Sequence, residues 1–372
     1  MPRSPDILVI GAGIVGCAVA HELARRGATV QVVEERAVGR GATHAAAGIL
    51  APHIEISSAD AFLDFAVRSL DAYDDFIARV QSDSGMRVLY RRSGTLQVAV
   101  THEAMQDLRG AAGRLEARGL RLSVLNAQGA RTEEPRLGAD VIGGLVVHAH
   151  GFVAAGELVD ALAAAARRYR ARFIEGCRVR RIASSGDDVV VETDGGSLSA
   201  SAAVLAAGSW SPHIEIAGVA VRPPVCPIRG QLVRLRTSTR ILERVVWSDR
   251  CYLVPWDDGT VLVGATMEDA GFDERTTVAG VRDLIEAACE LVPTMWTADF
   301  LDARAGLRPA SSDHRPIIGA STVLPNLMYA TGHFRNGILL APLTAALVAD
   351  AMLDGRVDPA LDATKPQRFG EL

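Results

Sequence analysis

Residues 7–34 read ILVIGAGIVGCAVAHELARRGATVQVVE, and this stretch decides the fold. The apolar run at 7–10 predicts a buried parallel strand, because it is short and ends directly at glycines. Small and apolar residues then recur at helical spacing until Gly27, which ends the helical pattern. The β-branched run at 29–33 predicts a second strand. The stretch is therefore predicted to form a complete β-α-β unit.

The glycines of this unit have the spacing of a dinucleotide-binding turn. Gly11 allows the tight turn, Gly13 lets the backbone approach a pyrophosphate, and Gly16 lets the helix pack closely on the strand. The pyrophosphate would lie at the positive end of the helix. Glu34 follows Gly16 by 18 residues and ends the second strand, where an acidic side chain accepts hydrogen bonds from a ribose and disfavours a 2′-phosphate. The pattern predicts dinucleotide binding over a plain structural turn, and it leaves NAD and FAD both open.

The length and composition are those of an ordinary globular α/β protein. The chain has 372 residues, which favours two domains over one core, and its formal net charge of −5 offers no basic face for nucleic acid. The five cysteines are odd in number and scattered without a CxxC pair, so neither a disulfide framework nor a zinc site is expected. No apolar run reaches the roughly 20 residues of a membrane helix, since the nearest, at 338–353, contains Pro342, Thr344 and Asp350. We expect a cytoplasmic protein with no nucleic-acid or membrane partner.

The remaining chain alternates between helical and strand patterns. The loop GRGATHAAAGILAP (39–52) permits close backbone approach to a large ligand, although its composition is also typical of a helix start. The expected helices lie at 60–82, 102–118, 155–169 and 278–291. The expected strands lie within 86–100 and at 145–153, 177–182, 188–193, 199–212, 229–235, 251–255 and 260–266. The pattern ends with an arginine-bearing loop and a strand at 305–319, followed by a strand, a turn and a helix at 326–342.

Two histidines of the strand expected at 145–153 could serve as metal ligands. His148 and His150 would point to one face of that strand. No third ligand lies in a recognisable cluster, so no metal site is predicted.

The turn at 332–337 is expected to end a strand and to open a helix. Its free backbone N–H groups and the helix dipole favour an anion there. A reduced flavin carries negative charge near N1, and a helix N-terminus is one way for a protein to tune that cofactor. The alternative is an ordinary strand–helix turn, which this segment alone does not exclude.

Five segments together resemble the D-amino-acid oxidase family of FAD enzymes. They are GAGIVG at 11–16, THAAAGILAP at 43–52, AAGSW at 206–210, GLRPASSDHRPIIG at 306–319 and GHFRNGILLAP at 332–342. The resemblance covers nearly the whole chain, and its last two segments are the ones specific to this family. It implies oxidation of glycine or another small primary or secondary amino acid, such as sarcosine or a small D-amino acid, by hydride transfer to FAD. With O2 as acceptor the products are a 2-oxo acid, ammonia or an amine, and hydrogen peroxide. Within the family the resemblance points to the branch of thiamine thiazole synthesis.

The resemblance also assigns roles to single residues. Arg308 matches the arginine that pairs with the substrate carboxylate, and Tyr252 matches the tyrosine that hydrogen-bonds to it. Arg335 matches the arginine of the flavin-side turn, and Met267 matches a methionine that lines the small pocket. Arginine suits this role because it binds a carboxylate bidentately and stays charged, whereas for Arg308 alone a surface salt bridge is the simpler interpretation. The implied FAD-binding residues are Gly11, Gly13, Ile14, Val15, Gly16, Glu34, Glu35, Ala42, Thr43, Ala47, Gly48, Ile49, Val179, Gly208, His333, Phe334, Arg335, Asn336, Gly337, Ile338 and Leu339.

We expect the FAD to be bound non-covalently. Some family members attach the flavin through a cysteine, and the segment 305–314 contains none. The resemblance further implies a homo-oligomer, specifically a homotetramer. Two alternatives remain open: a D-amino-acid dehydrogenase of the same fold that uses a non-oxygen acceptor, and a flavin-binding protein without catalysis.

The predicted fold class is α/β, in the form of an α+β two-domain protein. A Rossmann-like FAD-binding domain would comprise residues 1–85, 145–220 and 300–372. A second, antiparallel-sheet substrate domain would comprise residues 86–144 and 221–299.

Overall fold

The structure, a computed structural model, describes residues 5–56 and 60–372. A six-stranded sheet with the order β20-β21-β13-β1-β2-β9 forms the first lobe. Its strands are β1 (Ile7–Ile10), β2 (Val30–Val33), β9 (Arg172–Ile174), β13 (Ala202–Leu205), β20 (Ile317–Ala320) and β21 (Leu327–Thr331). Neighbours run parallel except β20 and β21, which are antiparallel. The predicted β-α-β unit is confirmed, with α1 (Ile14–Arg25) between β1 and β2.

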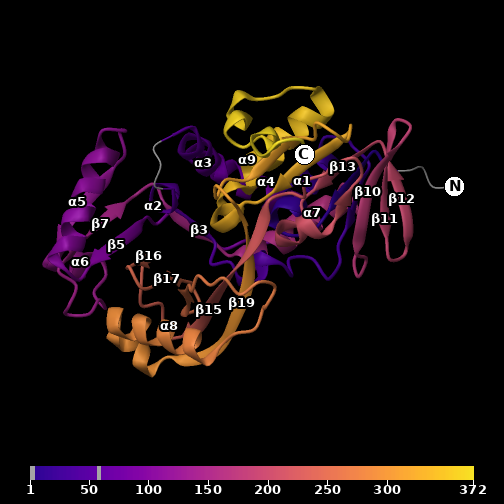
Figure 1. The fold of residues 1–372 in the computed structure, drawn as a ribbon. Coiled ribbons are helices and arrows are strands. Elements are labelled where there is room, and N and C mark those ends of the chain that lie inside the picture. Colours follow the sequence, from indigo (N-terminus) through magenta and orange to yellow (C-terminus); the bar gives the residue numbers. More distant parts are fainter. Residues whose placement is uncertain (1–4, 57–59) are drawn as a thin grey trace.

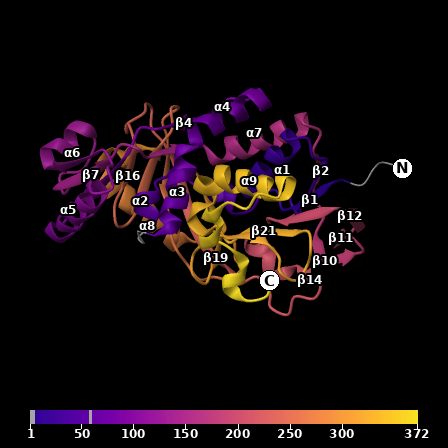
Figure 2. The ribbon, with the colours of Figure 1, turned by 90° about the horizontal axis from the view of Figure 1, so that it is seen from above.

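The central sheet is covered on both faces. Ile7 and Val9 of β1 pack into a helical layer, and Leu8 and Ile10 pack against a four-stranded sheet. This double burial explains why β1 is a continuous apolar run. The helices are α1, α3 (Ala61–Asp71), α4 (Tyr73–Ser84), α7 (Ala155–Arg168) and α9 (Gly337–Asp354), and the strands are β10 (Val179–Ser185), β11 (Asp188–Thr193), β12 (Gly196–Ala200) and β14 (Glu215–Ile216). Figure 2 shows the two layers on opposite sides of the sheet.

An eight-stranded sheet with the order β19-β15-β18-β17-β16-β5-β7-β6 forms the second lobe. Its strands are β5 (Thr95–Ala99), β6 (Leu122–Asn126), β7 (Gly143–Val147), β15 (Val225–Arg236), β16 (Val245–Trp247), β17 (Tyr252–Pro255), β18 (Thr260–Gly264) and β19 (Asp299–Ser311). Only β5 and β16 pair in parallel. The helices α5 (His102–Glu116), α6 (Ala127–Glu133) and α8 (Val278–Leu291) pack against this sheet. The predicted combination of a Rossmann-like unit and an antiparallel sheet is confirmed (Figure 1).

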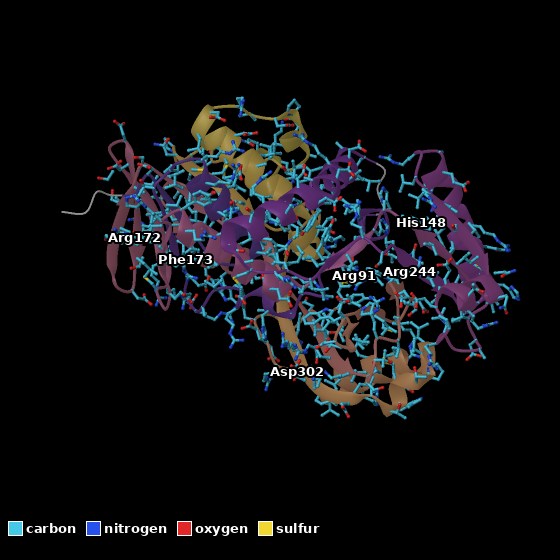
Figure 3. All side chains as sticks on the ribbon, turned by 180° about the vertical axis from the view of Figure 1, so that it is seen from behind. Arg91, His148, Arg172, Phe173, Arg244 and Asp302 are labelled. Atoms are coloured by element: carbon cyan, nitrogen blue, oxygen red, sulfur yellow. The ribbon has the colours of Figure 1, made fainter. Side chains whose placement is uncertain are left out.

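The two lobes are joined by short elements. A three-stranded sheet of β3 (Ile49–Leu50), β8 (Gly151–Val153) and β4 (Tyr90–Arg91) places Leu50 in the core of the helical layer and Phe152 against the large sheet. The helix α2 (Pro52–Glu55) follows β3. Short 3-10 helices are η1 (Ala42–Ala45), η2 (Gly208–His213), η3 (Pro293–Thr297), η4 (Phe334–Asn336), η5 (Pro359–Ala363) and η6 (Pro366–Phe369). Figure 3 shows the lobes end to end, with Arg172 at one end of the molecule and His148 at the other.

The strand predicted at 145–153 is wrong in its extent. The chain turns at His148 and Ala149, so β7 joins the large sheet and β8 joins the three-stranded sheet. His148 and His150 consequently do not share a strand face. The His148 ring lies within hydrogen-bond distance of the Ser123 hydroxyl at 3.1 Å, whereas His150 stacks on His53.

Three further expectations need correction. The helix predicted at 60–82 is two helices, α3 and α4, which meet at Ala72. The strand predicted within 199–212, ending at residues 206–208, is divided at Ser201, because β12 pairs with β11 while β13 enters the parallel sheet. Arg308 lies on strand β19 and not in a loop, since β15 pairs with β19 from Asp299 to Ser311. The partners of β13 and β19 are distant in sequence, and the local pattern does not reveal them.

One helix among the described residues, α9 with its preceding turn (Phe334–Asp354), is long and apolar enough to cross a membrane. Of its most apolar window, 67% is buried inside the protein, where α9 packs against α1 and α3. Packing inside the first lobe therefore accounts for its composition. The cytoplasmic location and the domain boundaries stay predictions.

Candidate active site

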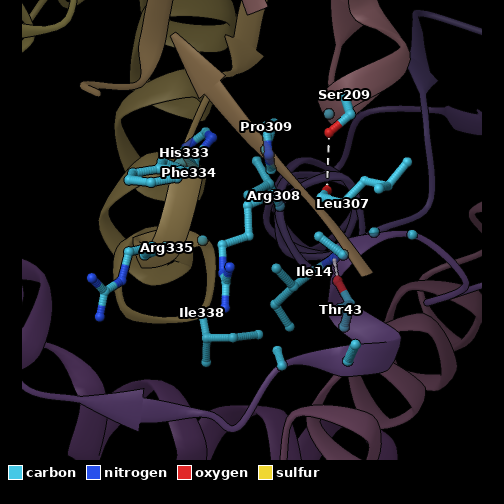
Figure 4. A pocket seen from close by; sticks show the side chains of 18 of the residues that line it. Ile14, Thr43, Ser209, Leu307, Arg308, Pro309, His333, Phe334, Arg335 and Ile338 are labelled. Carbon is cyan, nitrogen blue, oxygen red and sulfur yellow. Dashed lines mark hydrogen bonds between the residues drawn. The ribbon is translucent and has the colours of Figure 1, made fainter. Parts of the chain in front are cut away.

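A single cavity of about 590 Å³ runs from the glycine turn to the face of the large sheet. Its first half lies at the carboxyl ends of β1, β2, β13 and β21, where open parallel sheets bind their ligands. Its second half is walled by residues of β16 to β19, so both lobes contribute to one site. Figure 4 shows Arg308 projecting from β19 into the cavity, with Ile14 and Thr43 on the opposite wall.

Around the glycine turn the backbone packs so closely that a side chain at Gly11 or Gly16 would clash. Gly11 has a φ of +103°, and a Cβ there would lie 2.5 Å from the Ala206 carbonyl oxygen. A Cβ at Gly16 would lie 2.0 Å from the Gly11 carbonyl oxygen, which explains the close approach of α1 to β1. The Glu34 carboxylate accepts hydrogen bonds from the backbone N–H groups of Ala12 at 2.7 Å and Arg36 at 2.9 Å. This carboxylate is thereby fixed at the edge of the cavity, where a ribose hydroxyl can reach it.

The loop after β2 forms the next part of the wall. The Ile14 N–H donates to the Thr43 hydroxyl at 3.0 Å, which ties this loop to the start of α1. Gly48 has a φ of +74°, and a Cβ there would lie 1.8 Å from the Val153 carbonyl oxygen. Glycine at this position therefore lets the loop pack directly against the backbone of β8.

Most of the predicted FAD-binding residues line this cavity. They are Gly11, Gly13, Ile14, Val15, Glu34, Glu35, Ala42, Thr43, Ala47, Gly48, Ile49, Val179, Gly208, His333, Phe334, Arg335, Gly337 and Ile338. Gly16, Asn336 and Leu339 do not line it. Gly16 serves helix packing, and the Leu339 carbonyl accepts a hydrogen bond from the Ser69 hydroxyl at 2.7 Å inside the core. Their contact with a cofactor stays a prediction.

The turn before α9 lines the cavity at the start of that helix, where a helix N-terminus favours an anion. His333 in this turn is buried, and its Nε2 lies 3.2 Å from the Thr344 hydroxyl of α9. Burial lowers the pKa of His333 to about 3, so the ring is neutral at physiological pH. The positive character of this turn thus comes from the helix end and from Arg335, not from His333.

The four residues expected at the substrate end all line the same cavity: Arg308, Tyr252, Arg335 and Met267. The Arg308 guanidinium donates through Nη1 to the Thr266 carbonyl at 2.9 Å. Gly230 leaves space for this group, because a Cβ there would lie 2.3 Å from it. Gly264 does the same for Tyr252, where a Cβ would lie 2.4 Å from the phenol ring.

Sequence reasoning missed Glu55 and Trp247. Glu55, on α2, lines the cavity, and its carboxylate forms an ion pair with Arg335, with Nε to Oε2 at 2.8 Å and Nη2 to Oε1 at 3.2 Å. Trp247 lies beneath the Arg335 guanidinium at 6.0 Å and its ring is 5.2 Å from that of Tyr252. Glu55 could have been predicted, because it is an acidic residue shortly after the 39–52 loop. Trp247 could not, because its place in the site depends on strand pairing.

Burial controls the electrostatics of the substrate end. Burial lowers the pKa of the Arg308 guanidinium and raises the pKa of the Tyr252 phenol. Burial also raises the pKa of the Glu55 carboxyl, against the positive charges of Arg335 and Arg308. A buried guanidinium is costly to leave without a partner, so an anionic group in this space is favoured.

The fold and the cavity fit an FAD-dependent oxidoreductase. The glycine turn, the fixed acid Glu34 and the close-packed loop after β2 fit an extended dinucleotide that includes a flavin. The buried arginine at the far end supplies a place for a small anionic substrate.

Comparison with known proteins gives the family. The chain belongs to the FAD dependent oxidoreductase family (DAO), whose model matches residues 6–351. It is 33% identical to glycine oxidase of Geobacillus kaustophilus over 94% of this chain and 93% of that protein. The crystal structure of that enzyme superposes with a TM-score of 0.94, at 32% identity over 98% of this chain and 99% of that one. The predicted family, FAD dependence and enzyme class, an FAD-dependent amino-acid oxidase, are confirmed.

Two other similarities bear on the function. A bifunctional ThiO/ThiG protein of Synechocystis is 36% identical over 99% of this chain. The chain spans about half the length of that relative, 55% of it. A crystal structure of iminodiacetate oxidase from Chelativorans has a TM-score of 0.89 at 26% identity, covering 97% of this chain and 98% of that one.

Proposed function

We propose that the protein oxidises glycine and other small amino acids, such as sarcosine and small D-amino acids, at the α-carbon. The observation that carries the proposal is Arg308. Its guanidinium is half-buried in the cavity, and among the described residues no carboxylate lies within ion-pair distance of it. An α-carboxylate of the substrate supplies that partner, in the bidentate geometry that arginine favours.

The other residues of the substrate end support the same orientation. Tyr252 places a phenol beside Arg308 and donates a second hydrogen bond to the carboxylate. When bound, FAD would supply a hydride acceptor that O2 reoxidises, so that glycine, O2 and water would give glyoxylate, ammonia and hydrogen peroxide. The role of this chain is then to fix the α-carbon and to exclude water, which needs no general acid or base at the carboxylate.

A panel of amino acids tests this function. Purified protein is incubated in air with glycine, sarcosine, D-alanine, L-alanine and methylamine, and hydrogen peroxide is measured. We expect peroxide with the first three and little with methylamine, which lacks a carboxylate. Flavin bleaching without air combined with no peroxide in air would indicate a dehydrogenase with another acceptor. No bleaching with any amine would indicate a flavin-binding protein without catalysis.

We also propose that the product serves thiamine thiazole synthesis. The similarity to the bifunctional ThiO/ThiG protein over nearly the whole of this chain supports this assignment. A strain lacking the gene should require added thiazole for growth, and growth without thiazole would contradict the assignment.

We propose further that the protein forms a homo-oligomer, specifically a homotetramer, in the cytoplasm. Large apolar side chains on the second lobe support association, since Trp296 is 66% exposed and Phe300 is 55% exposed. Light scattering coupled to gel filtration measures the mass, and a monomer would contradict the proposal.

A further inference from the structure

The ion pair between Glu55 and Arg335 has no part in the function proposed above, although both residues line the substrate end. The Glu55 side chain is only 9% exposed, against 33% for Arg335. One hydrogen bond joins the pair, from Arg335 Nη2 to Glu55 Oε1 at 3.2 Å, and Arg335 Nε lies 2.8 Å from Glu55 Oε2. A buried carboxylate is retained only when a partner compensates for its lost hydration, and Arg335 is that partner.

The pair sets the charge of the substrate end. Arg308 and Arg335 contribute two positive charges, and Glu55 cancels one of them. Together these three side chains carry a net charge of +1, which one substrate carboxylate neutralises. A second carboxylate would find Arg335 already paired and would lie near the negative charge of Glu55, a like-charge contact that disfavours binding.

We propose that Glu55 is a specificity-determining residue that restricts the site to amines with a single carboxylate by occupying the second guanidinium. Replacing Glu55 with a neutral isostere would free Arg335 for a second anionic group, so the site would accept N-carboxymethyl amino acids. The inference rests on the proposed function, because it takes Arg308 as the partner of the α-carboxylate.

Sarcosine and iminodiacetate form a matched pair of substrates, since they differ only by one carboxylate on the N-methyl group. Initial rates of peroxide formation at about pH 8 give kcat/KM for each. In the native enzyme we expect sarcosine to be the better substrate. In Glu55→Gln we expect the ratio of iminodiacetate to sarcosine to rise by about tenfold or more, through KM rather than kcat.

Glu274→Gln is the matched control. Glu274 forms an ion pair at 2.7 Å with Arg36, which lines the cofactor half of the same cavity. The variant removes the same charge from an exposed pair, and the substrate ratio should stay at its native value. In the double variant Glu55→Gln/Arg335→Gln the gain for iminodiacetate should be lost, because the freed guanidinium is absent.

Binding of anions gives a second readout that does not depend on turnover. Acetate and malonate are titrated into the FAD-loaded protein, and the flavin spectrum reports each Kd. Glu55→Gln should tighten malonate relative to acetate by about tenfold. If Glu55→Gln fails to fold, Glu55→Ala tests the same claim, since it also frees Arg335 and should tighten malonate relative to acetate.

An unchanged ratio for both substrates and anions in Glu55→Gln overturns the inference. The proposed function fails in a different way, namely if the native enzyme bleaches with no amino acid. If the native enzyme oxidises sarcosine but Glu55→Gln leaves the iminodiacetate-to-sarcosine ratio unchanged, the proposed function is kept and the role of Glu55 is rejected.

Discussion

At the scale of single residues, the substrate end depends on positions where a side chain is absent. Arg308 lies on a strand paired with β15, and the opposite residue in the register is Ile228, close to Gly230. A residue larger than glycine at 230 would occupy the space of the guanidinium. Gly264 has the same relation to Tyr252. Glycines at 230 and 264 thus help to place the two side chains expected to bind the substrate.

Gly230→Ala should separate substrate binding from cofactor binding. The added Cβ would lie 2.3 Å from the Arg308 guanidinium, whose hydrogen bond to Thr266 limits its movement. We expect FAD to stay bound and kcat/KM for glycine to fall by roughly 10- to 100-fold, about 1.4–2.8 kcal/mol. Gly113→Ala is the control, because nothing lies within 4 Å of a Cβ there. Loss of FAD in Gly230→Ala, or native kinetics, would contradict the account.

His333 makes stability depend on pH. Its pKa lies at about 3 in the folded protein, below the ordinary value of 6.5, because burial disfavours the charged ring. Between these values the unfolded chain binds the additional proton, so this contribution to stability is present at pH 7 and is lost as the pH falls. The difference in unfolding free energy between native protein and His333→Gln should shrink by about 2 kcal/mol from pH 7 to pH 5. Urea titrations of both FAD-loaded proteins measure it, and a difference independent of pH would be the contrary result.

At the scale of secondary-structure elements, the sequence predicted what is local and missed what depends on distant pairing. The β-α-β unit at 7–34 was predicted to within a residue or two, because strand, turn, helix and acid each have their own local pattern. The helix at 278–291 was predicted with its observed bounds. In contrast, the division of 145–153 between two sheets and the position of Arg308 on β19 follow from partners far along the chain. Glu55 was missed because α2 is only four residues long and shows no periodicity.

Glu34→Ala should weaken FAD binding through the β-α-β unit. The change removes the acceptor of a ribose hydrogen bond and also the acceptor of the Ala12 N–H at 2.7 Å. We expect a loss of roughly 1–3 kcal/mol in FAD affinity, measured by titration of the apoprotein. Glu34→Gln keeps a neutral acceptor for the Ala12 N–H, so it should lose less. Unchanged affinity in Glu34→Ala would show that Glu34 does not hold the ribose.

At the scale of the whole molecule, one cavity is built by two lobes. The glycine turn belongs to the parallel sheet, whereas Tyr252 and Arg308 belong to the eight-stranded sheet. The resemblance implied that one domain binds FAD and the other binds the substrate. The shared cavity also depends on the pairing of β19 with β15, which no local sequence pattern predicts. A ligand that fills the cavity contacts both lobes and should couple their stabilities.

Removal of FAD should therefore loosen both lobes. A ligand at a hundredfold excess over its Kd stabilises the folded state by about 2.7 kcal/mol. Hydrogen exchange of apo and FAD-loaded protein measures where this stabilisation falls. We expect greater protection with FAD both in 7–34 and in 245–266. Protection limited to the first lobe would mean that FAD does not reach the large sheet.

The central claim is that Arg308 holds the substrate carboxylate while the α-carbon faces the flavin. The most direct measurement is the rate of flavin bleaching on anaerobic mixing with glycine, compared between native protein and Arg308→Ala. We predict that Arg308→Ala keeps its FAD and loses about 2–5 kcal/mol of transition-state stabilisation, roughly 30-fold to several-thousand-fold in rate at low glycine. Arg308→Lys should recover only part of this loss, since a point charge does not reproduce the planar fork. Equal bleaching rates in native and Arg308→Ala protein would remove Arg308 from the substrate site and contradict the account.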